Sequence, residues 1–259
     1  LLARTREAGE PRRPVQGHHV PALGQHATHA SRACKHMSDS LRRLHSLAAQ
    51  GDADAQCSLA KVLIVGDEIS QDFAEARRLY GLAAAQGHVE AQYNLGLVHY
   101  HGHGRLQDFA EARRLFGLAA AQGHVEAQQI LGFVHYHGHG GPQDHEEARR
   151  LYGLAVAQGH VEAQHFLGLM HFEGEGGPQD HQEARRLYGL AAAQGHAEAQ
   201  YDLGRMHYHS QGGLQDLEEA RRLFGLAAAQ GYANAQCNLG QMHYYGHGGP
   251  QDHQEARRL

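Results

Sequence analysis

Histidines are the residues whose number and spacing most suggest chemistry in this chain. The 259 residues include 25 histidines. The clearest group occurs twice, as His99, His101, His103 and His135, His137, His139. Imidazole nitrogens bind zinc when they converge at about 2.0–2.1 Å from the ion. An i, i+2 spacing across a helix end does not force the rings to converge, and Glu173 and Glu175 replace two of the three in the next copy. We therefore predict packing and loop roles, with no metal site and no cofactor.

Arginine pairs are a second candidate, for binding nucleic acid. They recur in register at 77–78, 113–114, 149–150, 185–186, 221–222 and 257–258. A helical repeat with a basic stripe can bind RNA with one repeat per base. Each pair also follows a glutamate by two or three residues, which favours an ion pair on the helix surface. The formal net charge of -5 is unlike that of a general nucleic-acid binder. We expect a salt-bridged helix face, with RNA binding as the alternative function.

Catalytic groups are missing from the sequence pattern. Cys57 and Cys237 both follow Ala-Gln, and no fixed base near them would lower a thiol pKa. We find no paired carboxylates, no nucleophile with its base and no phosphate loop, so we predict that the chain is not an enzyme. A regulatory repeat region of a larger enzyme is a third hypothesis. Because the chain begins at Leu1 and stops inside a repeat, we expect a fragment of a longer product.

Composition bears on the compartment of the protein and on its partners. The three cysteines form no even framework and require no oxidising compartment, so the cytoplasm is the favoured location. No apolar run approaches the roughly 20 residues of a membrane span, so we predict no membrane partner. Histidines titrate near pH 6.5. We therefore expect weaker stability or altered partner binding between about pH 7 and 5.5.

The elements that carry these residues form a strict repeat. The run Glu-Ala-Arg-Arg-Leu starts at Glu75 and returns every 36 residues until Glu255. A fixed period of this length is typical of a solenoid, in which each unit buries its apolar face against its neighbours. Five complete repeats are predicted at 53–88, 89–124, 125–160, 161–196 and 197–232, followed by a truncated sixth from Ala233. Residues 38–50 are expected to form a worn helix, and residues 1–37 a disordered basic and histidine-rich arm.

Each repeat is predicted to contain two antiparallel helices, here named helix A and helix B. In the second complete repeat, helix A spans Val89–His101 and helix B spans Phe109–Gln122. Asp108 and Glu111 fit a capping box, in which the Glu side chain reaches back to the cap. Glycines end both helices. Gly96 in helix A and Gly117 in helix B are both expected to lie where helices approach closely.

These residues resemble the Sel-one-like repeat (SLR) family, a tetratricopeptide-like two-helix module. The residues of one repeat that match the family pattern are Ala91, Leu95, Gly96, Gly102, Gly104, Asp108, Glu111, Ala112, Ala119, Ala120 and Gly123. The resemblance covers about residues 38–259 and implies an all-α fold, a right-handed α/α superhelical solenoid of 36-residue repeats. It implies an adaptor or scaffold for protein complexes and supplies no catalytic residues. The family's helix A tyrosine is histidine in five copies, at His99, His135, His171, His207 and His243.

Variation between the copies is concentrated in helix A, which lines the concave groove in tetratricopeptide-like stacks. Helix B is nearly constant, which is typical of a structural frame. We therefore predict a groove for partner proteins or peptides, because aromatic and Arg residues often dominate binding energy. The predicted groove residues are Tyr93, Asn94, Leu97, Gln129, Phe133, His165, Phe166, Leu169, Tyr201 and Arg205. The alternative is neutral drift at tolerant surface positions.

Overall fold

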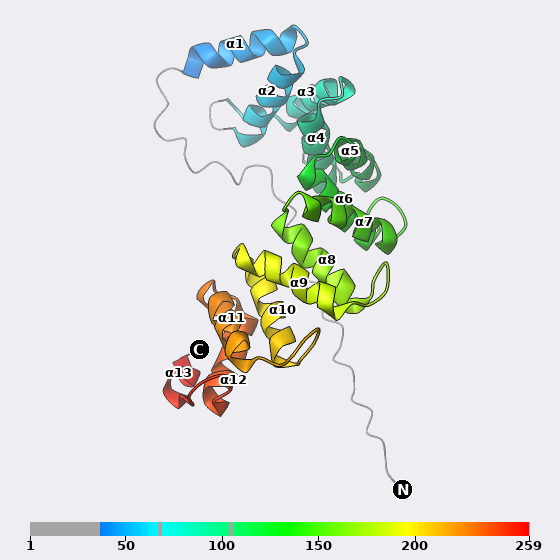
Figure 1. The fold of residues 1–259 in the computed structure, drawn as a ribbon. Helices are drawn as coiled ribbons and strands as arrows, with labels where there is room; N and C mark the ends of the chain where they lie inside the picture. The colour runs from blue at the N-terminus through cyan, green and yellow to red at the C-terminus, as the bar shows by residue number, and fades with distance from the viewer. Residues whose placement is uncertain (1–36, 67–68, 104–105, 259) are drawn as a thin grey trace.

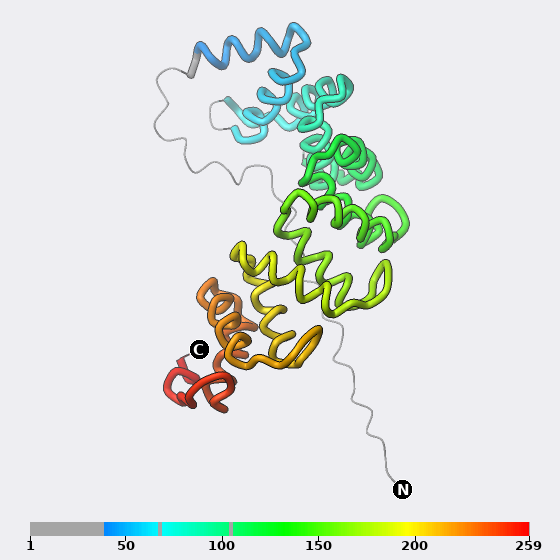
Figure 2. The backbone as a smooth tube through the Cα atoms, in the orientation of Figure 1, coloured from blue at the N-terminus to red at the C-terminus, as the bar shows by residue number. Residues whose placement is uncertain are grey.

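The computed structural model describes residues 37–66, 69–103 and 106–258, which form thirteen α-helices and no strand. Each helix packs on the next, and the array runs from α1 to α13 as an elongated solenoid (Figures 1 and 2). The helices A are α2 (Ala53–Val65), α4 (Val89–His101), α6 (Val125–His137), α8 (Val161–Glu173), α10 (Ala197–Tyr208) and α12 (Ala233–Tyr245). The helices B are α3 (Phe73–Ala85), α5 (Phe109–Ala121), α7 (His145–Ala157), α9 (His181–Ala193), α11 (Leu217–Ala229) and α13 (His253–Arg258). This architecture confirms the predicted α/α solenoid.

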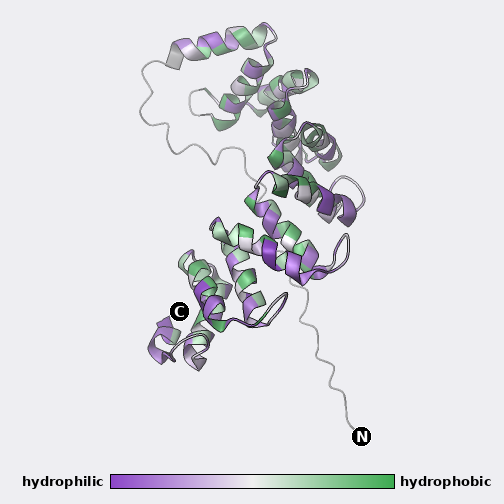
Figure 3. Cartoon of the chain, viewed as in Figure 1, coloured by the Kyte–Doolittle hydropathy of each residue, from purple (hydrophilic) through white to green (hydrophobic). Residues whose placement is uncertain are grey.

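The N-terminal part begins with α1 (Met37–Ala49), at the place of the worn helix. The predicted arm lies outside the described residues, apart from Met37 in the first turn of α1. Figure 3 shows hydrophobic and hydrophilic residues mixed along each helix of the array, as expected for helices that bury one face against their neighbours.

Aspartates cap the helices B, as predicted, but the second half of the capping box was wrong. The Asp108 carboxylate accepts the backbone N–H of Glu111 at 3.0 Å. The Glu111 side chain does not return to the cap, because its two oxygens accept 2.7–2.8 Å hydrogen bonds from Arg114. The backbone N–H of Asp108 donates instead to the carbonyl of His99, the residue that ends helix A's last buried turn. Gly102 then stops helix A with a left-handed φ of 70°.

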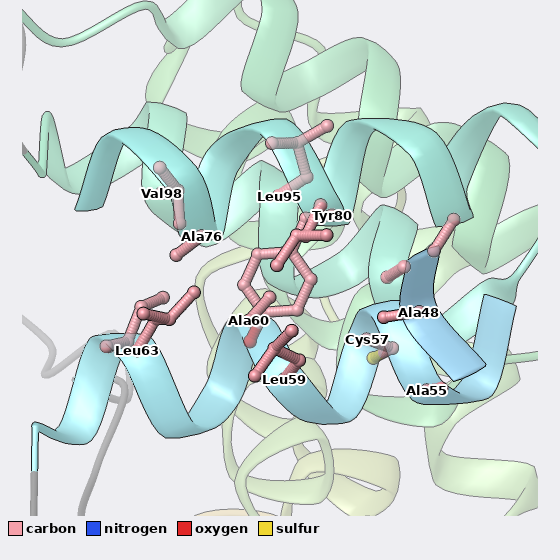
Figure 4. Packing of buried hydrophobic residues seen from close by; sticks show 14 of the residues in the cluster. Ala48, Ala55, Cys57, Leu59, Ala60, Leu63, Ala76, Tyr80, Leu95 and Val98 are labelled. Carbon is pink, nitrogen blue, oxygen red and sulfur yellow. The ribbon is translucent and has the colours of Figure 1, made fainter. Parts of the chain in front are cut away.

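Glycine in helix A makes room for the largest ring of helix B. Figure 4 shows the equivalent place in the first repeat, where Tyr80 lies against Ala60. In the next repeat a Cβ at Gly96 would stand 2.6 Å from the ring of Phe116, which is fully buried. The same close contact joins Gly132 to Tyr152. The prediction of close helix approach at Gly96 is therefore confirmed.

The same interpretation was wrong for the glycine in the middle of helix B. A Cβ added at Gly117 would meet no atom within 4 Å, the helix's own nearby backbone aside. The equivalent positions are equally open, at Gly81, Gly153, Gly189 and Gly225. We expected a contact because glycine inside a helix costs stability relative to alanine, so a glycine repeated at one position suggested that a larger residue would not fit. The structure provides no steric reason for it.

A buried glutamine in the helices A from α2 to α10 joins successive helices. In α6 the amide of Gln128 donates to the carbonyl of Ala120 in α5 at 3.3 Å. Its oxygen accepts the amide of Gln158, the C-cap of α7, at 2.9 Å. The same hydrogen bond, from the C-cap glutamine of helix B to the buried glutamine of the preceding helix A, recurs at 2.8–2.9 Å. The pairs are Gln86–Gln56, Gln122–Gln92, Gln158–Gln128, Gln194–Gln164 and Gln230–Gln200. We call this series of glutamine pairs the glutamine ladder. A buried amide without hydrogen-bond partners costs free energy, so the ladder fixes the position in which each helix packs on the next.

The two arginines of each pair have different tasks. The second forms the predicted ion pair on its own helix, as between Arg150 and Glu147 at 2.7 Å. The first reaches the following repeat. Arg149 donates to Nδ1 of His171 in α8 at 2.7 Å and to the carbonyl of Pro178 in the next loop at 3.4 Å. We call this contact between the first arginine and the histidine of the next repeat the arginine clasp. It is also formed by Arg113 with His135, Arg185 with His207 and Arg221 with His243.

Gly117→Ala is expected to raise stability by about 1 kcal/mol, since alanine is the better helix former and the site is open. The matched substitution Gly96→Ala should bring no gain, because the helix benefit is offset by overlap with the buried Phe116 ring. Urea denaturation followed by circular dichroism measures both changes. An unchanged or lower midpoint for Gly117→Ala would show that this glycine does have a steric role.

Arg149→Ala is expected to destabilise the solenoid by about 1 kcal/mol or more, because it leaves two acceptors of the next repeat without their donor. Arg150→Ala serves as the control, since a surface ion pair contributes only about 0.2–1 kcal/mol. Thermal denaturation of the two variants tests the difference. Equal losses would contradict separate tasks for the two arginines.

Candidate partner-binding surface

Most of the predicted groove residues lie inside the contacts between repeats. Seven are less than 9% exposed, namely Tyr93, Asn94, Leu97, Gln129, Phe133, His165 and Tyr201. Tyr93, for example, stacks on His124 of the following helix A with ring centroids 4.7 Å apart. Phe166, Leu169 and Arg205 are partly exposed. Variation at the seven buried positions therefore changes the packing between neighbouring helices A, whereas the three others keep part of their surface exposed.

Two hollows meet at Arg205 on the helix A side of the C-terminal repeats. The smaller, of about 40 Å³, lies between α8, α9 and α10, and its lining includes Leu169, Phe172 and Asp202. The larger, of about 290 Å³, lies between α10, α11 and α12. Its lining is formed by Arg205, Tyr208, His209, Phe224, Asn238, Gln241, Met242, Tyr245 and His247. We call these two linings together the Arg205 surface.

The charged groups of the Arg205 surface are loosely paired. The Arg205 guanidinium lies 3.8 Å from the Asp202 carboxylate, beyond hydrogen-bond distance. It also lies 5.8 Å from the centre of the Tyr201 ring. The other Asp202 oxygen is 3.0 Å from Nε2 of His165. Arg205 therefore holds its positive charge at the junction of the two hollows in a loose ion pair with Asp202.

The sequence argument missed the aromatic residues that line these hollows, such as Phe172, Tyr208 and Tyr245. Phe172 and Tyr208 occupy a position that is aromatic in successive repeats, so a search for variable residues passed over them. Phe172 stacks on His181 at the start of α9, with ring centroids 4.9 Å apart. An aromatic residue near the end of each helix A from α4 to α12 was the signal that could have identified Phe172 and Tyr208.

The loop histidines pack against aromatic rings of the preceding repeat. The ring of His103 stacks on Phe73 at 5.2 Å with an interplanar angle of 7°. His139 stacks on Phe109 at 5.2 Å, and its Nδ1 is hydrogen-bonded to the hydroxyl of Tyr100 at 2.9 Å. These contacts support the packing and loop roles expected for this group.

The other candidates from the sequence show no sign of a site. Burial raises the pKa of the Cys57 thiol to about 11, so Cys57 is protonated and unreactive at neutral pH. The recurring arginine pairs make contacts within the protein, as Arg149 does with His171 and Arg150 with Glu147. Within residues 37–66, 69–103 and 106–258, no helix is long and apolar enough to cross a membrane.

Histidines also cap the helices A, which the sequence did not suggest. Nδ1 of each cap histidine accepts the backbone N–H three residues later at 3.1–3.2 Å. The caps are His88, His124, His160 and His196. An Nδ1 that accepts a hydrogen bond cannot carry a proton. Burial lowers the pKa of His160, which keeps this imidazole neutral.

Three of the histidines held by the arginine clasp, His135, His171 and His207, are also kept neutral, because their pKa values are lowered. Burial and, after it, the nearby Arg149 lower the pKa of His171. Burial and Arg113 act in the same direction on His135. The aspartate that caps the following helix B and the glutamate in its first turn oppose this shift only in part. The clasp requires the neutral form, because the imidazole accepts the guanidinium N–H.

Stability is therefore expected to fall as the pH drops below about 6.5, the ordinary pKa of histidine. The unfolded chain binds protons there before the folded chain does, so stability is full above this pH and declines toward the lowered folded pKa values. Melting curves between roughly pH 7.5 and 5.5 test this. The triple variant His135→Gln, His171→Gln, His207→Gln keeps an acceptor for each arginine and should show a smaller pH dependence. An equal dependence would contradict the assignment.

Comparisons with known proteins place this fold in a family. The Sel1 repeat model matches at residues 53–88, 89–124, 125–160, 161–196, 197–232 and 233–259. No match was found among curated proteins.

Two crystal structures are similar to the chain. One is a protective antigen present in uropathogenic Escherichia coli strains that displays an SLR fold. It is 33% identical with a TM-score of 0.82, over 84% of this chain and 47% of the antigen, so this chain spans about half of that relative. The other is a Sel1 repeat protein from Oxalobacter formigenes, 26% identical with a TM-score of 0.75, over 86% of this chain and 90% of that protein. Sel1 repeat proteins generally act as protein-interaction scaffolds. With a family match over residues 53–259, the chain belongs to the Sel1 repeat family.

Proposed function

We propose that this chain is a non-catalytic scaffold that binds a partner protein or peptide on the Arg205 surface. The observation that carries the proposal is the meeting of two hollows at Arg205, a position where the sequence differs between repeats. Leu169 and Arg205, two of the predicted groove residues, contribute to this surface. Phe166 is partly exposed on the same helix as Leu169.

The chemistry of the surface favours an amphipathic partner. Phe172, Tyr208 and Tyr245 offer aromatic surface, and Arg and Tyr are enriched among residues that dominate interface energies. Arg205 offers a positive charge whose ion-pair partner, Asp202, lies 3.8 Å away, beyond hydrogen-bond distance. A peptide segment that inserts an apolar side chain into the larger hollow and presents a carboxylate to Arg205 matches these groups.

The small size of the hollows argues against a small-molecule substrate as the main ligand. A pocket for a compact ligand usually encloses about 300–1,000 Å³. The larger hollow reaches only about 290 Å³ and the smaller about 40 Å³. Shallow neighbouring hollows along successive helices suit an extended chain that contacts several repeats.

Arg205→Glu is expected to weaken capture of partner proteins at least tenfold, because it reverses the charge at the centre of the surface. Arg186→Glu is the matched control. Both arginines follow an acid by three residues, so both substitutions place like charges at i, i+3. Arg186 lies in helix B, away from the two hollows.

Affinity capture followed by quantitative mass spectrometry provides the measurement. Partners that are lost with Arg205→Glu and retained with Arg186→Glu would support the proposal. Undiminished capture by Arg205→Glu, with circular dichroism unchanged, would rule out this surface as the binding site.

A further inference from the structure

We propose that His165, His196 and Glu198 form a site for a divalent transition-metal ion such as zinc. One ligand atom from each of the three side chains lies within 4.8 Å of the other two. Among the described residues they are the one such group of histidine, cysteine and carboxylate side chains. His165 comes from α8, and the other two residues come from the start of α10, so a bound ion would join two successive helices A.

The hydrogen bond to Asp202 prepares His165 to bind a metal. Nε2 of His165 lies 3.0 Å from the Asp202 carboxylate, which can only accept, so this nitrogen carries the proton. Nδ1 then faces the Glu198 carboxylate at 3.7 Å. Two acceptors that face each other at this distance suit a cation between them, either a second proton on the ring or a metal ion. A carboxylate behind a ligand histidine is a usual arrangement at zinc sites, where it orients the ring and raises its basicity.

The surroundings of His165 also suit a bound ion. The His165 side chain is 6% exposed, whereas Glu198 is 39% exposed and offers a path from solvent. The rings of His165 and His196 lie with centroids 4.9 Å apart, and Tyr188 closes another side at 5.5 Å. The carboxylates of Glu198 and Asp202 supply two negative charges, which exceed the roughly half positive charge of the helix N-terminus.

The distance between His165 and Glu198 requires only a small adjustment. Ligand atoms of a tetrahedral zinc ion stand about 3.3 Å apart, given metal–ligand bonds of about 2.0–2.1 Å. The gap of 3.7 Å between His165 and Glu198 is close to this value. Three protein ligands and a water complete a coordination shell that zinc commonly adopts.

Comparison of the repeats sets this group apart. A cap histidine followed two residues later by glutamate is present at His88, His124, His160 and His196. The corresponding third residues are Cys57, Tyr93, Gln129 and His165 in turn. Tyr93 and Gln129 are not such ligands, and among the described residues only the group with His165 brings its three ligand atoms within 4.8 Å of one another. The repeat that contains Gln129 therefore has the same two ligands without the third and serves as an internal control.

Zinc titration of the full chain by calorimetry tests the site, with variants that each remove one histidine. His165→Gln introduces the residue found in the neighbouring repeat, so the fold should tolerate it. It is expected to bind one fewer high-affinity zinc ion than the unmodified chain. His160→Gln removes a cap histidine that lacks the third ligand and should keep the full number. Asp202→Asn should weaken this one site about 10- to 100-fold, as loss of an outer-shell carboxylate usually does.

Glu198→Gln provides a second test at a more exposed residue and should also remove one zinc ion. Equal zinc binding by His165→Gln and the unmodified chain would overturn the proposal. Equal losses in His165→Gln and His160→Gln would assign the zinc to cap histidines in general and would also overturn it. Nitrogen NMR that shows His165 protonated at both ring nitrogens, with no change on adding zinc, would identify a proton as the cation.

Discussion

The buried glutamine of the helices A from α2 to α10 is the contact on which the stacking of this solenoid depends. Gln128 is 4% exposed and takes one hydrogen bond from the helix after it while giving one to the helix before it. An apolar contact tolerates a slip between helices, whereas a buried amide loses both partners when they slip. The glutamine ladder therefore fixes one packing position for each helix, and the remaining contacts form in that position.

The clasp of Arg149 on His171 acts at the opposite end of the same helices. The glutamines lie near the start of helix A, and the clasp lies near its end, where it also holds the following loop. Together they attach each repeat to the next at two distant points. This attachment gives the Arg205 surface its form, because that surface is made from residues of three successive repeats.

The cap and clasp histidines explain why so many imidazoles persist in a packed repeat. A neutral imidazole is both a donor and an acceptor, so His124 caps its helix through Nδ1 and contacts Glu90 through Nε2. A serine or aspartate cap would satisfy the backbone but could not span to the neighbouring helix. The caps His88 and His124 therefore serve as bridges between repeats as well.

The sequence by itself determined the repeat and the ends of its helices. Asp108 and Gly102 act on the backbone within a few residues, so their effects follow from local order. Only the tertiary structure decided which side chains remain accessible. Tyr93 is buried and Arg205 is open because the side chains of the following repeat cover one and leave the other. Contacts between residues distant in sequence decide which side chains are exposed and which partner each arginine of a pair binds. They also bring His165 close to Glu198. The periodicity of the sequence alone does not predict these contacts.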